Sequence, residues 1–118
     1  MQQQVGAAAE RAVVEYLRAR GLAIVATNLR IGRLELDVVA RDGGLIIVIE
    51  VRSRGPGAWQ GGLGSIDGRK RLRIRRAAER LWRDRYKHDP SAERLRFDVA
   101  SVVFEDGVPA IEYVVAAF

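Results

Sequence analysis

Four charged residues lie in two short segments that are otherwise rich in apolar and β-branched residues. Glu35 and Asp37 alternate with leucine and valine, and Glu50 and Arg52 follow a run of apolar residues. Residues two apart in a β-strand share one face of the sheet, so each pair points in one direction. Burying a lone carboxylate is costly, and such a residue therefore needs a partner, a proton or a metal ion.

The turn signal Asp42-Gly43-Gly44 between the two segments predicts a β-hairpin. A loop formed by Asp42-Gly43 pairs Glu35 with Glu50, whereas a loop formed by Gly43-Gly44 pairs Asp37 with Glu50. Either register places Glu35, Asp37, Glu50 and Arg52 on the same face. The predicted cluster therefore does not depend on the choice of turn.

A cluster of carboxylates suggests a metal site. Carboxylates a few ångströms apart repel each other, and a hard divalent cation with oxygen ligands compensates for this repulsion. Mg²⁺ fits best because it retains waters that can act as nucleophiles, with Mn²⁺ as a substitute. The alternatives are a solvated sheet face, or an ion pair between Glu50 and Arg52 without metal. The position of Glu50 at the end of an apolar run favours the metal site.

Glu10 interrupts the apolar stripe of a helix predicted from Val5 to about Arg20. It stands at helical spacing with Val13 and Leu17, which places it on the inward side. The alternative is that a carboxylate one turn from the helix start only favours the helix dipole.

A second predicted helix begins at Ser65 or Asp67, either of which can cap it, and runs to about Tyr86. Six of eight consecutive residues near its start are basic and none is acidic. These residues are Arg69, Lys70, Arg71, Arg73, Arg75 and Arg76. Unneutralised cations at the positive end of a helix suit phosphate contacts, and the net charge of +5 agrees with an anionic partner. The alternative is an ordinary charged surface.

The composition excludes several other kinds of site. The 118 residues include no cysteine, which removes disulfides, thiolate nucleophiles and cysteine-bound zinc. The single histidine, His88, lies in a polar stretch and does not support a catalytic triad. The sequence has no signal-peptide pattern and no apolar run long enough to span a bilayer. We therefore expect a cytoplasmic protein without a membrane partner.

The order of predicted elements is α-β-β-β-α-β-β within a single domain, residues 1–118. Residues 53–64, between the strand predicted at 45–52 and the second helix, are rich in glycine and are expected to form a mobile loop. Strands are predicted at 22–27, 34–40, 45–52, 95–104 and 110–115.

Several short motifs resemble the YraN family of bacterial proteins, in the right order and spacing from residue 6 to about 105. The matching segments are Gly6-Ala7-Ala8-Ala9-Glu10-Arg11-Ala12, Tyr16-Leu17, Gly21, Asn28-Leu29-Arg30, Glu35-Leu36-Asp37, Val48-Ile49-Glu50-Val51-Arg52-Ser53-Arg54, Lys70 and Arg96-Phe97-Asp98-Val99. That family resembles the PD-(D/E)XK restriction-endonuclease-like fold, and within it the archaeal Holliday junction resolvases.

The resemblance implies roles for individual residues. Asp37 corresponds to the motif aspartate, Glu50 to the (D/E) position and Arg52 to the lysine position. Glu10 corresponds to an additional metal ligand on the first helix, and Lys70 lies near a later basic motif. Two departures are that arginine replaces lysine at Arg52 and that leucine precedes Asp37. Arginine can stabilise charge but cannot transfer a proton.

These observations predict a restriction-endonuclease-like α/β domain, with a mixed central sheet flanked by helices, that hydrolyses DNA phosphodiesters. Asp37 and Glu50 are the expected metal ligands, assisted by Glu10 and Glu35, and Arg52 completes the catalytic set. The six basic residues between 69 and 76 are expected to bind DNA or another nucleic acid. Because resolvase-like folds often dimerise, a homodimer is allowed. Two alternatives stay open: a nucleic-acid-binding module that has lost hydrolysis, and an interaction subunit whose basic helix docks an acidic protein.

Overall fold

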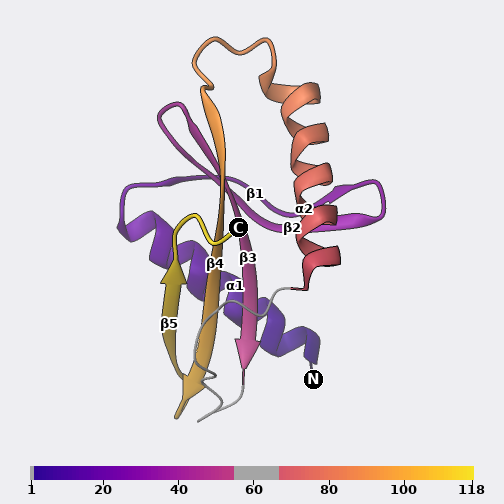
Figure 1. Cartoon of the computed structure of the whole chain (residues 1–118). Coiled ribbons are helices and arrows are strands. Elements are labelled where there is room, and N and C mark those ends of the chain that lie inside the picture. The colour runs from indigo at the N-terminus through magenta and orange to yellow at the C-terminus, as the bar shows by residue number, and fades with distance from the viewer. Residues whose placement is uncertain (1, 55–66) are drawn as a thin grey trace.

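The computed structural model describes residues 2–54 and 67–118, and it contains two α-helices, a short π-helix and five strands (Figure 1). The elements in chain order are α1 (Gln2–Ala19), β1 (Ala23–Ile31), β2 (Leu34–Asp42), β3 (Leu45–Arg54), α2 (Gly68–Leu81), the π-helix η1 (Trp82–Tyr86), β4 (Arg94–Glu105) and β5 (Val108–Val114). This order confirms the predicted α-β-β-β-α-β-β arrangement.

The five strands form one mixed sheet in the order β1-β2-β3-β4-β5. Strands β3 and β4 are parallel, and the chain returns between them through α2, whereas the other neighbouring pairs are antiparallel. A parallel pair requires such a crossover connection, and a helix is its usual form. The result is the restriction-endonuclease-like α/β arrangement predicted from the sequence.

The two helices pack on opposite faces of the central strand β3. Ile47 and Ile49 pack with residues of α1 such as Val13, whereas Ile46 and Val48 pack with residues of α2 such as Ile74. Burial on both faces explains why β3 is a nearly continuous apolar run. A polar residue at the end of this run therefore lies beside the core.

The first hairpin departs from regular alternation. The sequence predicts that Leu36 and Val38 share a face, but Leu36 packs on the α2 side and Val38 on the α1 side. Strand β1 has a register shift between Ile24 and Ala26, and Asn28 has a φ of 51°. The hairpin therefore bends, and its distal part reaches across to α2 (Figure 1).

Helix α2 begins as predicted, because the carboxylate of Asp67 accepts a hydrogen bond from the backbone N–H of Arg69 at 2.8 Å. The helical segment also reaches Tyr86, but its last turn is the π-helix η1.

The predicted loop at 53–64 is wrong at its start, because Ser53 and Arg54 belong to β3, whose pairing with β4 extends to them. The rest of that loop and the alternative cap Ser65 lie outside the described residues. Among the residues that the structure describes, no helix is long and apolar enough to cross a membrane.

Candidate active site

Asp37 and Glu50 lie side by side where β2 separates from β3. The ladder joins Asp42 to Leu45 and ends with Val38 opposite Ile49, which is the register of a Gly43-Gly44 turn. Beyond it, the Asp37 carboxylate accepts a hydrogen bond from the backbone N–H of Val51 at 2.9 Å. The Asp37 side chain thus takes the place of a backbone acceptor for Val51 where the two strands separate. This hydrogen bond holds Asp37 against β3.

Asp37 is held in an environment that disfavours its charge. Burial raises the pKa of Asp37 from 3.8 to about 7, and the neighbouring Glu50 contributes the next largest effect. The hydrogen bond from Val51 opposes this shift, whereas the charge of Glu10 adds slightly to it. Two carboxylates that repel each other in a partly buried position form a site that favours a proton or a cation.

Helix α2 supplies a cation to this pair. The Nζ atom of Lys70 lies 2.5 Å from Oε1 of Glu50, whose side chain is only 7% exposed. Glu50 alternates with Ile46 and Val48, so it faces α2, where Lys70 is positioned by the first turn of the helix. The first turn of α2 therefore belongs to the site.

Arg52 follows Glu50 by two residues on β3, pairs in register with Ser101 of β4 and is partly buried. Strand alternation places Arg52 on the α2 side of β3 with Glu50. The predicted triplet of Asp37, Glu50 and Arg52 is therefore brought to one end of the hairpin.

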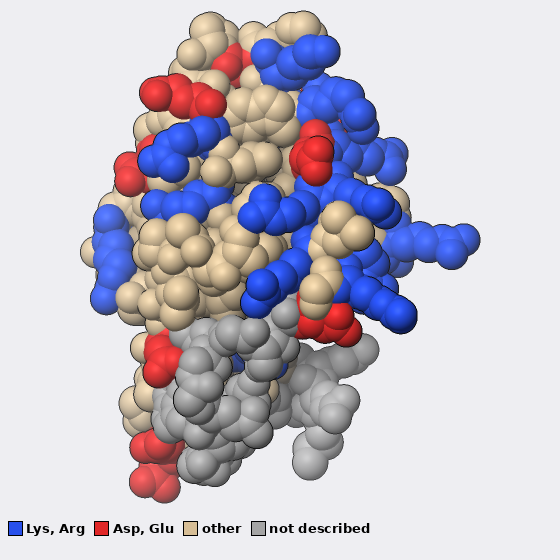
Figure 2. Space-filling model, viewed as in Figure 1, with Lys and Arg blue, Asp and Glu red and all other residues tan. Residues whose placement is uncertain are grey.

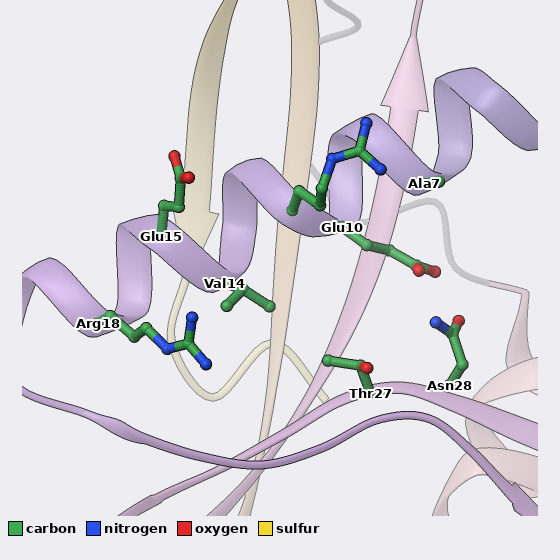
Figure 3. A pocket seen from close by; sticks show the side chains of 8 residues that line it. Ala7, Glu10, Val14, Glu15, Arg18, Thr27 and Asn28 are labelled. Carbon is green, nitrogen blue, oxygen red and sulfur yellow. The ribbon is translucent and has the colours of Figure 1, made fainter.

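Glu10 approaches the same carboxylates from the other helix, because its charge acts on Asp37. It also lines a groove of about 420 Å³ between α1 and β1, where its side chain extends toward Asn28 (Figure 3). The start of α1, the end of β3 and the start of α2 all lie at one end of the molecule (Figure 1).

Glu35 lies apart from this cluster. Its side chain is 43% exposed, and its carboxylate lies 3.9 Å from a guanidinium nitrogen of Arg30. The sequence-based prediction that Glu35 shares a face with Asp37 fails because regular alternation breaks at the bend between Leu36 and Val38. Within residues 2–54 and 67–118, no group of three or more acidic, histidine or cysteine residues has the arrangement of a preformed metal cage.

The basic residues predicted for nucleic-acid contact spread around α2, where Lys and Arg side chains gather on the surface (Figure 2). Arg69, Lys70, Arg73, Arg75 and Arg76 are exposed, and Arg71 is partly buried. Arg75 differs from the rest because its guanidinium lies 4.7 Å from the centre of the Phe97 ring. Arg75 thus contributes packing as well as charge.

Asp98 is a fully buried acid to which the sequence reasoning assigned no role. It accepts two hydrogen bonds from Arg96, at 2.9 and 2.8 Å, one from the Tyr113 hydroxyl at 2.5 Å and one from the Ala116 backbone N–H at 2.9 Å. These contacts join β4, β5 and the C-terminal segment. The signal was an arginine two residues before an aspartate in an apolar strand, a spacing that places both side chains on one face.

Comparison with known proteins places the chain in a family. Residues 9–102 match the family described as "Uncharacterised protein family UPF0102". A UPF0102 protein of Sorangium cellulosum is 56% identical over 115 residues, which covers 97% of this chain and 80% of the relative. A UPF0102 protein of Pseudomonas aeruginosa is 38% identical, covering 96% of this chain and 90% of the relative, and one of Anaeromyxobacter dehalogenans is 38% identical, covering 98% and 84%. The chain therefore belongs to the UPF0102 (YraN) family, as its motifs predicted.

Proposed function

We propose that this protein is a metal-dependent nuclease that hydrolyses phosphodiester bonds in DNA. The observation that carries the proposal is the pairing of Asp37 with Glu50 in a partly buried position, where burial first and the charge of Glu50 next raise the pKa of Asp37 to about 7. Two carboxylates held together in a partly buried position disfavour each other's charge, and Lys70 pairs directly with Glu50. Strongly perturbed groups of this kind are concentrated at functional sites.

The donor set fits a small divalent cation. Mg²⁺ is usually held by one or two carboxylates together with waters and substrate phosphates, rather than by a cage of protein ligands. Asp37 and Glu50 are the ligands we propose, with Glu10 placed to assist, and Glu35 is left out because it is exposed and pairs with Arg30. Mn²⁺ has similar ligand preferences and should substitute. When bound, such an ion lowers the pKa of a coordinated water and offsets charge on the phosphate.

The protein's own cations complete the proposed site. Arg52 lies two residues beyond Glu50 and can donate hydrogen bonds to a phosphate oxygen, although it cannot act as a base. The side chain of Lys70 is 47% exposed, so Lys70 can leave its ion pair with Glu50 and bind a phosphate instead. The remaining basic residues of α2 would add affinity that depends on salt rather than on base sequence.

The experiment is a nuclease assay on branched, single-stranded and duplex DNA with Mg²⁺, Mn²⁺ or EDTA. We expect cleavage only with a divalent metal, and its loss in Asp37→Asn and Glu50→Gln, both of which keep the side-chain shape. Asp42→Asn, at the exposed end of β2, and Glu105→Gln, at the exposed end of β4, are the matched controls. Cleavage that persists in EDTA, or that survives both site variants, would disprove the proposal.

A second candidate is a nucleic-acid-binding module that has kept the fold but not the hydrolysis. It is favoured by Arg52 at the position of the superfamily's lysine and by the direct contact of Lys70 with Glu50. Binding of DNA without cleavage by either the natural protein or Arg52→Lys, in Mg²⁺ and in Mn²⁺, would establish this alternative.

A further inference from the structure

A groove of about 430 Å³ runs between α2 and the turn that joins β1 to β2. Its rim carries four arginines: Arg33 from the turn and Arg73, Arg76 and Arg80 from α2. Its floor includes the apolar side chains of Ile31 and Leu34. Two of the arginines, Arg33 and Arg80, lie outside the basic cluster that the sequence singles out.

The turn and the helix approach each other closely at one end of the groove. Gly32 has a φ of 62°, and a β-carbon at this position would lie 3.4 Å from Nη1 of Arg80. This contact exists because the first hairpin bends near Asn28 and reaches across to α2. The groove is therefore formed by tertiary structure and is absent from either segment alone.

The charge of the groove is unbalanced. Every charged residue among the described residues that line it is an arginine. Arg80 also has an acidic neighbour, but its Nε lies 3.9 Å from Asp84, and both side chains are more than half exposed. A pair this long and this exposed to water is readily replaced by a better anion. Four guanidinium groups around one groove thus favour a ligand that brings negative charge.

The groove continues from the candidate active site along one helix. Lys70, Arg73, Arg76 and Arg80 follow one another at intervals of three or four residues, so they form a row along α2. At a rise of about 1.5 Å per residue, the row extends roughly 15 Å from the lysine beside Glu50. The steps of three and four residues correspond to about 4.5 and about 6 Å along the helix axis, a spacing that suits a ligand whose negative charges repeat along a chain.

We propose that this groove binds the sugar–phosphate backbone of the nucleic-acid strand next to the phosphate at the active site. The inference rests on the proposed function, because it assumes a nucleic-acid substrate. The guanidinium groups match phosphate oxygens in geometry and charge, and the apolar floor offers a surface to the sugar. Arg33 and Arg80 are assigned to backbone binding, away from the site of hydrolysis.

The test compares two double variants in metal-free buffer, where cleavage does not interfere. Arg33→Gln/Arg80→Gln removes two charges from the groove, and Arg85→Gln/Lys87→Gln removes two exposed charges near the end of η1. The probe is a fluorescent single-stranded oligonucleotide, and anisotropy gives Kd over a range of salt concentrations. We expect the groove variant to weaken binding by about tenfold or more at low salt and to flatten the salt slope by about 1.4, at roughly 0.7 per phosphate contact.

The same variants separate this inference from the nuclease proposal. Weaker binding by the groove variant in a protein that never cleaves would support the groove and reject the nuclease. Unchanged binding by that variant in a protein that does cleave would reject the groove alone. Equal losses in both double variants would also reject the groove, because the effect would then reflect overall charge. Circular dichroism confirms folding, and Arg33→Gln alone, at an exposed turn, should give about half the change in slope.

Discussion

The Nζ atom of Lys70 lies 2.5 Å from a carboxylate oxygen of Glu50, so the first turn of α2 neutralises part of the acidic pair at the end of β3. This contact joins the sheet to the helix, which are separated in the chain by the thirteen residues 55–67. In the proposed function, a lysine in this position would compete with a metal ion for the same carboxylate. Removing it would then change metal affinity and the rate of cleavage in opposite directions.

Replacing Lys70 by glutamine should strengthen metal binding and weaken cleavage. The variant removes a positive charge that repels the metal, but it also removes a cation that can contact phosphate. Calorimetric titration with Mn²⁺ measures the first effect, and initial cleavage rates at saturating metal measure the second. Lys87→Gln is the control, since Lys87 is an exposed lysine beyond η1. Weaker metal binding in Lys70→Gln would contradict competition between the two cations.

The contribution of Asp37 to the stability of the metal-free protein should fall as pH rises from about 4 to about 7. Asp37 has a pKa of about 7 in the folded protein and 3.8 as its ordinary value, so the folded state binds more protons between these values. Stability from this group is therefore present at low pH and is lost as pH rises through the window, at up to roughly 1.4 kcal/mol per pKa unit.

Asp37→Asn removes the titrating carboxylate itself, so the difference from the natural protein reports on the acidic pair. Its free energy of unfolding, measured with urea, should exceed that of the natural protein above about pH 7 and approach it near pH 4. The asparagine oxygen can still accept the hydrogen bond from Val51. Asp42→Asn, on the same strand, should run parallel to the natural protein. A constant difference between Asp37→Asn and the natural protein at every pH would show that Asp37 does not titrate in this range.

Arg52→Lys should retain cleavage, whereas Arg52→Gln should reduce it on the order of 100-fold, the usual cost of removing one donor to a developing charge. In the proposed function, lysine would preserve the charge that stabilises the transition state, and it restores the residue of the wider superfamily. A higher cleavage rate in Arg52→Lys than in the natural protein would indicate that a proton-transfer step is slow when residue 52 is arginine. The measurement is single-turnover cleavage at saturating DNA, which separates chemistry from binding.

Asp98→Ala should destabilise the fold by about 3–5 kcal/mol, since it leaves a partly buried arginine without its partner. It also removes the acceptor for Tyr113 and for the Ala116 backbone, which hold β5 and the C-terminal segment. Urea denaturation should show this loss, with Glu105→Ala on the exposed end of β4 as the control. A loss similar to that of the control would mean that these hydrogen bonds contribute little.

The sequence was sufficient for features that depend on local chemistry. The cap at Asp67 follows from capping preference, the burial of β3 on both faces from its apolar run, and the shared face of Asp37 and Glu50 from strand alternation. The structure then decides between the two possible registers of the hairpin, and it has that of the Gly43-Gly44 turn. The sequence was insufficient where tertiary contacts determine the position of a side chain. The position of Glu35 depends on a bend in the hairpin, and the alternation of apolar and polar residues in the sequence does not reveal that bend. The contact between Lys70 and Glu50 depends on how α2 packs on the sheet.

The bend of the first hairpin also affects how the sheet meets other molecules. Strand β1 is an edge strand, and its free side would offer hydrogen-bond donors and acceptors to a strand from another chain. The register shift after Ile24 and the left-handed conformation of Asn28 interrupt that row. At the opposite edge, Pro109 of β5 lacks an N–H group. The irregularity that bends the first hairpin toward α2 therefore also discourages edge-to-edge aggregation of the sheet.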